Sequence, residues 1–247
     1  MSAQPRAARG LGTPRLHLRC TDSTNDRART LALSGAPHGT LVTAGEQRAG
    51  RGRQGRAWSA PAGRALLASL VLRDVPALLA LASAVAVADV VGPAAASRAG
   101  GDDAAVAIKW PNDVLLDGRK VAGILAEGRP QEGWVVLGIG INVAVREQDL
   151  PPELAARATG LGLEPGAIEP LLERLLAALE LRLAQDSAAT LGAYRARDAL
   201  AGREVRWQHG RGVAAGIDDA GRLLVDLPDG GREALEAGEV HLATVAL

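Results

Sequence analysis

Residues 45–63 form the stretch whose residue types and spacing are best suited to chemistry. The nine residues 48–56 hold four arginines and three glycines with no acidic residue between them. Glycine lets a backbone approach a ligand closely, and guanidinium groups bind carboxylate and phosphate oxygens in pairs. The stretch has no apolar period, so we expect neither a packed helix nor a buried strand. It predicts an anion-binding loop; a solvated basic loop is the alternative.

The same loop matches the pattern G-x-G-x-x-G at Gly50, Gly52 and Gly55. A dinucleotide site needs a strand that runs into the first glycine and a helix that starts at the last one. Polar residues precede the loop, and Trp-Ser-Ala-Pro follows it at 58–61. We therefore reject a Rossmann fold. A protein kinase is excluded as well, because no H-R-D or D-F-G element follows.

Two lysines stand out because the chain otherwise uses arginine for positive charge. They are Lys109 and Lys120. Asparagine is also rare, and the chain has three: Asn25, Asn112 and Asn142. An ammonium group is a compact point charge, whereas a guanidinium group is planar. We expect both lysines to occupy positions where arginine would not serve.

The composition limits the domain count, the partners and the location. A chain of 247 residues suits one large domain or a large domain plus a small one. Its 28 basic and 28 acidic residues give no overall attraction to nucleic acid or acidic membranes. Cys20 is the single cysteine, which excludes an intramolecular disulfide and favours a reducing compartment. We find no signal peptide, and the apolar run 75–91 is short for a membrane span. A soluble cytoplasmic protein is expected.

The strands and helices that must position these residues are expected along residues 15–199. Residues 1–14 are rich in Ala, Arg, Gly and Pro and are expected to be disordered. N-cap residues at 21–26 precede a helix that ends near Ser34, and Asp-Gly-Arg at 117–119 predicts a hairpin turn. Strands are expected at 15–20, 40–44, 65–72, 105–109, 114–116, 120–127 and 133–143, further helices at 76–91, 168–183 and 188–199, and a loop at 94–103.

The pattern changes near Leu200. Short strands are expected at 205–208, 212–217, 223–227, 233–235 and 240–245, with turn signals between them. Short strands at such close spacing are typical of a small β-barrel. We therefore expect one domain over residues 15–199 and a second, small domain over residues 200–247.

Four separated motifs share one chemical theme. They are TDSTN at 21–25, GRGRQGRAW at 50–58, KWPNDVLLDGRKVAGILAE at 109–127 and GIGIN at 138–142. In this order they resemble the biotin protein ligase family; the first and last are weak singly, and the third is highly specific. The resemblance covers most of the chain up to Asn142. It implies an α+β fold, with a mixed-sheet, class II synthetase-like catalytic domain followed by a small C-terminal SH3-like β-barrel.

The resemblance implies an ATP-dependent ligase that works in two steps. The carboxylate of biotin attacks the α-phosphate of ATP, which gives biotinyl-5′-AMP and pyrophosphate. A lysine of the biotin carboxyl carrier domain of an acyl-CoA carboxylase then attacks the mixed anhydride. Mg²⁺ is the implied metal, because a triphosphate must be neutralised. We expect a monomer or homodimer with no nucleic-acid or membrane partner.

The resemblance also assigns roles to single residues. Lys109 should offset charge at the α-phosphate, Lys120 should meet the carboxyl end of biotin, and Arg53 joins them as the third catalytic group. The residues implied for biotin are Ser23, Thr24, Asn25, Gln47, Arg51, Gly52, Arg53 and Lys120. Those implied for the nucleotide are Arg51, Arg53, Trp58, Lys109, Asn112 and Asn142, and Asp113 is the implied metal ligand.

Several of these positions keep a second interpretation. Trp58 either covers the adenine or plugs the base of the loop. Asp113 either faces the metal or caps the turn that precedes it. Gly138 and Gly140 either mark close approach of a ligand to a strand or are packing positions. Cys20 falls in an expected strand, and we interpret it as a small buried residue.

Five other functions compete with this one. Some family members carry an N-terminal helix-turn-helix domain and act as repressors, but only about twenty residues precede TDSTN, so we expect the monofunctional type. A lipoate ligase would lack the arginine–glycine loop, and an octanoyltransferase needs a catalytic cysteine, for which Cys20 is misplaced. A non-catalytic biotin-binding module is disfavoured because Lys109 and Lys120 are both retained. A nucleic-acid regulator would need a basic face on residues 200–247, whose charges are mixed.

Overall fold

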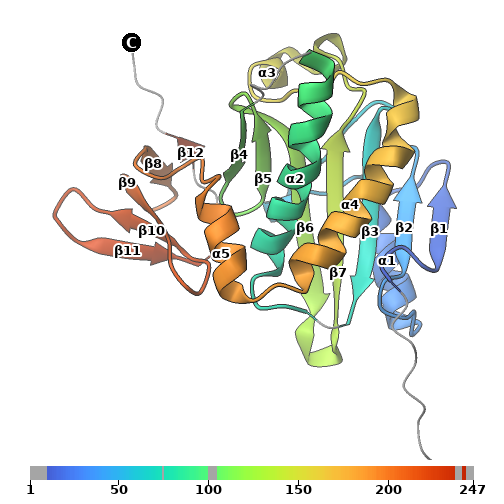
Figure 1. Ribbon diagram of the computed structural model, residues 1–247, viewed down its shortest axis with the longest axis horizontal. Coiled ribbons are helices and arrows are strands. Elements are labelled where there is room, and N and C mark those ends of the chain that lie inside the picture. Colours follow the sequence, from blue (N-terminus) through green and yellow to red (C-terminus); the bar gives the residue numbers. More distant parts are fainter. Residues whose placement is uncertain (1–9, 74, 100–104, 237–240, 243–247) are drawn as a thin grey trace, which may run out of the picture.

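The computed structural model describes residues 10–73, 75–99, 105–236 and 241–242. Its largest element is a seven-stranded sheet in the order β1-β2-β3-β7-β6-β5-β4 (Figure 1). β1 runs parallel to β2, and the other neighbouring pairs are antiparallel, so the mixed sheet expected from the sequence is confirmed. The strands are β1 (Arg15–Leu18), β2 (Leu41–Ala44), β3 (Ala65–Leu72), β4 (Val106–Lys109), β5 (Asp113–Leu116), β6 (Arg119–Arg129) and β7 (Trp134–Asn142).

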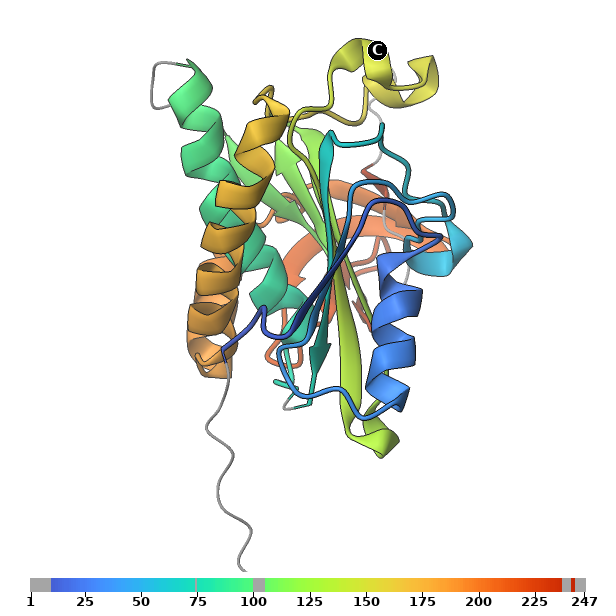
Figure 2. The same cartoon turned by 90° about the vertical axis from the view of Figure 1, so that its right-hand side faces the viewer.

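Helices cover both faces of this sheet. α2 and α4 lie on one face, and α1 lies on the other (Figure 2). Because the central strands are covered on both sides, β3 and β7 are buried at every position, and their sequences are mostly apolar instead of alternating between apolar and polar residues. The helices are α1 (Thr24–Leu33), α2 (Leu79–Ala99), α3 (Pro152–Ala155), α4 (Ile168–Leu183) and α5 (Ser187–Arg195).

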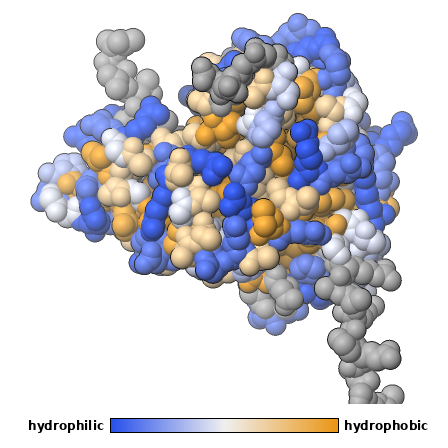
Figure 3. Space-filling view, in the orientation of Figure 1, coloured by the Kyte–Doolittle hydropathy of each residue, from blue (hydrophilic) through white to orange (hydrophobic). Residues whose placement is uncertain are grey.

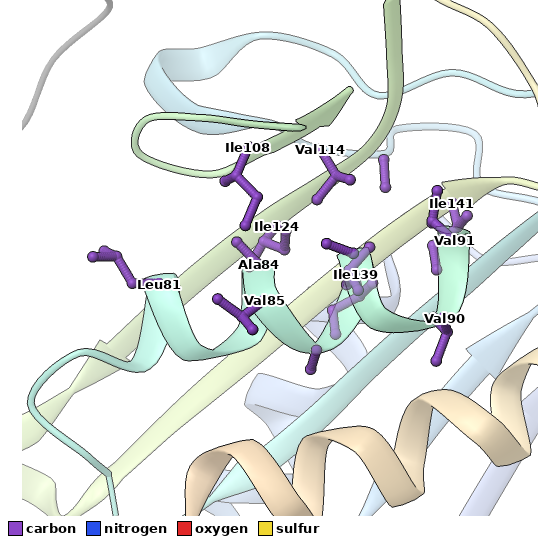
Figure 4. Close-up of a cluster of buried hydrophobic side chains, with 14 of the residues drawn as sticks. Leu81, Ala84, Val85, Val90, Val91, Ile108, Val114, Ile124, Ile139 and Ile141 are labelled. Carbon is purple, nitrogen blue, oxygen red and sulfur yellow. The ribbon is translucent and has the colours of Figure 1, made fainter. Parts of the chain in front are cut away.

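The main core lies between α2 and the sheet. Val85 and Val91 of α2 pack toward Ile124, Ile139 and Ile141 of the two central strands (Figure 4), and all five are at most 3 % exposed. By length and composition α2 is apolar enough to cross a membrane, but 72 % of that apolar window is buried inside the protein. Its apolar character is therefore explained by its place in the core.

The helix α2 differs from its prediction at both ends. It begins at Leu79 instead of residue 76, and it continues through Pro93 to Ala99. The loop expected at 94–103 is thus wrong for residues 94–99, while residues 100–104 lie outside the described part. Pro93 removes one helical hydrogen bond, but Ala94 and Ala95 are buried in the core, and alanine has the highest helix propensity. Packing and propensity together outweigh the proline.

The C-terminal segment forms a separate five-stranded antiparallel sheet in the order β11-β10-β9-β8-β12, consistent with the expected SH3-like barrel. Trp110 Nε1 donates to the carbonyl of Gly221 at 3.0 Å, and Arg195 Nη2 donates to the carbonyl of Ile217 at 2.7 Å. These bonds attach the turn after β4, and helix α5, to the small sheet. Its strands are β8 (Glu204–Trp207), β9 (Gly210–Ile217), β10 (Leu223–Asp226), β11 (Arg232–Leu235) and β12 (His241–Leu242).

The surface carries mixed side chains. Figure 3 shows hydrophilic residues spread over the face in view, with apolar residues scattered among them. The most exposed large apolar side chains among the described residues are Leu33 and Leu181, at 59 % and 62 %. They lie on different helices, α1 and α4, and isolated apolar residues of this kind are ordinary on protein surfaces.

Two expectations near the N-terminus are wrong. Residues 10–14 are ordered instead of belonging to a disordered tail, because Leu11 N donates to Glu180 Oε1 at 2.6 Å and Gly12 N to the carbonyl of Gly39 at 2.8 Å. Residues 1–9 lie outside the described part. β1 ends at Leu18, so Cys20 follows the strand and is partly exposed instead of buried. The chain bends there because it must cross from the sheet edge to the start of α1.

Candidate active site

One cavity of about 770 Å³ gathers the residues of the four motifs. It lies between the N-terminus of α1, the basic loop that follows β2, the strands β4, β5 and β6, and the carboxyl end of β7. The fold therefore brings together segments as distant in the chain as Asn25 and Asn142. Every site residue predicted from the sequence lines this cavity: Ser23, Thr24, Asn25, Gln47, Arg51, Gly52, Arg53, Trp58, Lys109, Asn112, Asp113, Lys120 and Asn142.

Uncharged side chains form a hydrogen-bond network at one end of the cavity. The backbone nitrogen and the hydroxyl of Thr24 donate to Gln47 Oε1 at 2.7 and 2.9 Å. Ser69 Oγ lies 2.8 Å from Thr24 Oγ1 and 2.6 Å from Asn25 Oδ1. Ser23, Thr24 and Asn25 are at most 5 % exposed, and they stand at the start of α1, where backbone N–H groups lack helical partners. This end suits a polar, uncharged group.

Two glycines of β7 make room for the cavity wall. A Cβ atom at Gly138 would overlap Asn25 Oδ1, and one at Gly140 would overlap the ring of Trp58. Both glycines therefore serve close packing of side chains that themselves line the cavity. The indole of Trp58 covers the bare face of β7, and Gly123 of β6 lies against its other edge.

The basic loop is irregular, as its lack of periodicity predicted. It contains one short 3-10 turn, η1 (Arg53–Gly55), in which Gln54 has a φ of 54° and Gly55 a φ of 73°. Left-handed backbone is unfavourable for residues with a side chain, and glycine adopts it freely. Gly55 thus supports the turn of the loop, and Arg51, Arg53 and Arg56 line the cavity.

Acidic and amide side chains hold the loop arginines. Arg51 Nη2 lies 2.7 Å from Asp26 Oδ1 and 2.8 Å from Glu127 Oε2. Arg53 Nη1 donates to Asn112 Oδ1 at 3.3 Å. Burial lowers the pKa of the Arg53 guanidinium, the charge of Asp113 opposes that shift, and neighbouring Arg56 adds to it. The guanidinium still stays protonated, because arginine titrates far above neutral pH.

The two lysines lie on different strands around one carboxylate. Lys109 pairs with Asp113 in the register of β4 and β5, and Lys120 Nζ lies 2.6 Å from Asp113 Oδ1. The ammonium of Lys120 also stands 5.5 Å from the centroid of the Trp58 ring, within the range of a cation–π contact. The Lys120 ammonium is thus within reach of both the carboxylate and the aromatic ring.

Two asparagines at the charged end are fixed by backbone carbonyls. Asn112 Nδ2 donates to the carbonyl of Ile124 at 2.7 Å, and Asn142 Nδ2 donates to that of Thr159 at 3.0 Å. Each amide is oriented by this bond, so its oxygen points to the other side. For Asn112 that oxygen accepts the hydrogen bond from Arg53.

The cavity is strongly cationic. Among the described residues, its lining holds one acidic residue, Asp113, against seven basic ones: Arg51, Arg53, Arg56, Lys109, Lys120, Arg157 and Arg206. Two donors in the wall, Arg51 Nε and Trp58 Nε1, are buried and have no hydrogen-bond partner in the described part of the chain. Buried donors are rarely left unpaired in native proteins. Charge and unpaired donors together indicate a ligand with several anionic oxygens.

Reasoning from the sequence missed several residues of this site. Ser69 is the one polar residue in the apolar run of β3, a signal that could have identified it. Glu127 ends the third motif, yet no role was assigned to it. Arg157 and Arg206 line the cavity from the segment after α3 and from β8. No local pattern marks these two arginines, because only the tertiary fold brings them to the cavity.

A metal has limited support from the protein alone. Within the described ranges, no group of three or more His, Cys, Asp or Glu side chains could hold an ion. Asp113 is the carboxylate of the cavity, and one of its oxygens is engaged by Lys120. Mg²⁺ in nucleotide sites is commonly held by one or two carboxylates plus phosphate oxygens and water. The donor set therefore fits a magnesium ion brought in with a nucleotide.

Comparison with known proteins decides the family. The model of the "Biotin/lipoate A/B protein ligase family" matches residues 17–143, and that of the "Biotin protein ligase C terminal domain" matches residues 202–242. The biotin–[acetyl-CoA-carboxylase] ligase of Mycobacterium tuberculosis is 40 % identical over 239 residues, which cover 90 % of this chain and 86 % of that protein. The chain belongs to the biotin protein ligase family. A second biotin–[acetyl-CoA-carboxylase] ligase, from Paracoccus denitrificans, is 40 % identical over 237 residues, covering 89 % and 97 %.

The fold agrees with that of a solved family member. The biotin protein ligase of Aquifex aeolicus, solved in complex with biotin and ATP, superposes with a TM-score of 0.73 at 27 % identity. The match covers 93 % of this chain and 98 % of that one. The mixed sheet and the small C-terminal sheet of this chain are therefore arranged as they are in a solved biotin protein ligase.

Proposed function

We propose that this protein joins biotin to a lysine of a biotin carboxyl carrier domain, using ATP. The observation that carries the proposal is the polarity of the cavity. Its uncharged end, built by Thr24, Asn25 and Gln47, leads directly into a cationic end built by the loop arginines and two lysines. Biotin has the same polarity, with an uncharged ureido ring at one end and a carboxylate at the other.

In the proposed binding mode, the ureido ring lies against the α1 end of the cavity. Ser23, Thr24, Asn25 and Gln47 offer both donors and acceptors, which a ring with N–H and C=O groups requires. The carboxylate then points to Arg51, Gly52, Arg53 and Lys120. Unpaired Arg51 Nε is one donor that such an anion would satisfy.

The first step forms biotinyl-5′-AMP. A carboxylate oxygen of biotin attacks the α-phosphorus of ATP, a P–O bond forms, and the bond to the β-phosphate breaks to release pyrophosphate. Arg53, Lys109 and Lys120 lie where negative charge accumulates, and fixed cations stabilise such a transition state. Trp58, Asn112 and Asn142 are the proposed groups on the adenosine side, with Arg51 and Arg53 on the phosphates. Mg²⁺ would bind Asp113 and the phosphates, and it supplies charge neutralisation there.

The second step moves the acyl group to the carrier. The amine of a carrier lysine attacks the acyl carbon, an amide bond forms, AMP leaves with the electron pair of the broken C–O bond, and the amine loses a proton. Water would compete for the same carbon, so the basic loop must cover the adenylate. The proposal places this reaction in the cytoplasm, where ATP and reduced thiols are available.

A substrate panel tests the proposal. Purified protein is incubated with ATP, Mg²⁺, a carrier domain and either biotin, lipoate or octanoate, and the mass of the carrier is measured. We expect modification of one lysine with biotin and none with the other acids. Transfer of lipoate or octanoate without biotin transfer would establish the second candidate, a lipoate-type ligase. An octanoyltransferase is disfavoured because Cys20 is not among the residues that line the cavity.

A further inference from the structure

Glu127 contacts two functional groups although it does not line the cavity itself. It lies on β6, with its side chain 25 % exposed, behind the wall formed by Asn25 and Arg51. A single carboxylate oxygen, Oε2, lies 2.8 Å from Asn25 Nδ2 and 2.8 Å from Arg51 Nη2. One atom of Glu127 thus connects the uncharged end of the cavity to the basic loop.

The contact with Asn25 determines which way its amide points. A carboxylate only accepts hydrogen bonds, so it must face the NH₂ group of Asn25. The amide oxygen then receives Ser69 Oγ at 2.6 Å, and Gly138 lies beneath the amide. With both ends engaged and 5 % of the residue exposed, the Asn25 side chain has one orientation in which every group is paired.

The contact with Arg51 fixes the start of the basic loop. The same Nη2 atom lies 2.7 Å from Asp26 Oδ1, so two carboxylates share one guanidinium. The side chains of Arg51 and Asp26 are 34 % and 48 % exposed. Solvent therefore screens these ion pairs, and they stabilise the fold little. Their main consequence is geometric, because they set where Arg51 stands relative to Asn25.

We propose that Glu127 is a positioning residue that holds Asn25 and Arg51 in register, so that the uncharged end of the cavity and the start of the basic loop keep a fixed position relative to one another. The inference deepens the proposed function and rests on it for the identity of the acid. Loss of Glu127 disturbs both ends of one ligand at the same time. If Glu127 had only a structural role, its loss would not selectively affect either end of the cavity.

Three variants separate these possibilities. Glu127→Ala removes both hydrogen bonds, and Glu127→Gln keeps a neutral acceptor for Asn25 while it removes the charge that faces Arg51. Glu173→Gln is the matched control, because Glu173 is exposed on α4 and far from the cavity lining. Biotin affinity is measured by calorimetry, and thermal unfolding is measured for each variant without ligand.

We expect Glu127→Ala to weaken biotin binding roughly tenfold or more, the factor that accompanies loss of a charge-assisted hydrogen bond. Glu127→Gln should recover most of that loss, and Glu173→Gln should bind as wild type does. In a double-mutant cycle, the effects of Glu127→Ala and Asn25→Ala should be less than additive, because part of the effect of Glu127 is exerted through Asn25. Wild-type affinity in Glu127→Ala, or full additivity in the cycle, overturns the proposal.

Trypsin provides a readout that does not depend on the identity of the acid. Cleavage after Arg51 in the free protein is followed by mass spectrometry, and we expect it to accelerate in both Glu127 variants and not in Glu173→Gln. Equal cleavage rates in wild type and in the Glu127 variants would show that Glu127 does not restrain Arg51. If the wild type bound no biotin while cleavage still accelerated, the proposed function would fail and the positioning role would stand.

Discussion

Lys120 Nζ lies 2.6 Å from Asp113 Oδ1, and this ion pair joins two strands of the sheet at the charged end of the cavity. The side chains are 34 % and 21 % exposed, so the pair is neither fully buried nor freely solvated. The Asp113 carboxylate therefore fixes the position of the Lys120 ammonium. In the proposed binding mode this ammonium meets the carboxylate of the substrate.

Substitution of Asp113 by asparagine should lower the rate of carrier biotinylation roughly tenfold, because an oriented ammonium loses its charged partner. The shape of the site is kept, so the midpoint of thermal unfolding should change little. A magnesium titration distinguishes the two interpretations of Asp113. If Asp113 binds the metal, half-maximal rate requires more Mg²⁺ in Asp113→Asn; an unchanged titration with a wild-type rate would contradict both roles.

Gly140→Ala should impair catalysis by displacing Trp58. A Cβ atom at Gly140 would overlap the indole ring, so the ring must move from the bare face of β7. We expect a changed tryptophan emission spectrum and a lower rate of adenylation. Gly192→Ala is the control, since Gly192 lies in α5 and an added methyl group there would enter open space. That variant should keep full activity and gain roughly 0.5–1 kcal/mol of stability.

The pH dependence of stability should reveal Asp198. Burial raises the pKa of this carboxyl, although hydrogen bonds from the backbone N–H groups of Leu200 and Ala201 oppose the shift. A raised pKa in the fold means that the native state holds its proton more tightly, so stability is lost as pH rises from the unfolded pKa through the folded one. Asp198→Asn removes this loss.

The measurement is the difference in unfolding free energy between Asp198→Asn and wild type as a function of pH. We expect that difference to shift in favour of the variant as pH rises above about 4, the ordinary pKa of an aspartate. A difference that is constant over the range would show that Asp198 titrates as an ordinary exposed carboxyl.

Asp89 of α2 should be important for stability and not for catalysis. Its two oxygens bind Arg182 Nε at 2.7 Å and Arg197 Nη2 at 3.0 Å, which ties α2 to α4 and to the segment after α5. Asp89→Ala leaves two partly buried guanidinium groups unpaired and should cost roughly 2–3 kcal/mol, between the values for exposed and buried pairs. Urea unfolding measures this loss. If the variant lost less unfolding free energy than a variant of an exposed surface residue, the prediction would be contradicted.

Most of the sheet could be predicted from the sequence because its patterns are local. The strand Ala65–Leu72 and the helix Ile168–Leu183 have the bounds that the sequence predicts, since the strand is apolar except for Ser69 and the helix has a clear helical period. The prediction for α2 is too short because Pro93 is a strong local signal, and packing that only the fold reveals overrules it. Propensity is a weak prior wherever tertiary contacts compete with it.

In the candidate site, too, some residues could be recognised from the sequence and others could not. The lysines, the asparagines and the arginine loop are recognisable by residue type, and the structure gathers them in one cavity. Ser69 and Glu127 form hydrogen bonds with Asn25, a relation between helix α1 and two strands distant in the chain that no sequence spacing encodes. The division into a domain at 15–199 and a domain at 200–247 stays a prediction, as do the individual roles of the site residues.

The most direct test of the central claim is biotin-dependent exchange of pyrophosphate into ATP, measured for wild type and for Lys120→Ala. Exchange requires reversible formation of the adenylate and no carrier protein. We predict exchange in the wild type that depends on biotin and Mg²⁺, and a fall of roughly a hundredfold or more in Lys120→Ala, the effect of removing one group that stabilises transition-state charge. A folded wild-type protein without biotin-dependent exchange would contradict the claim that this cavity activates biotin.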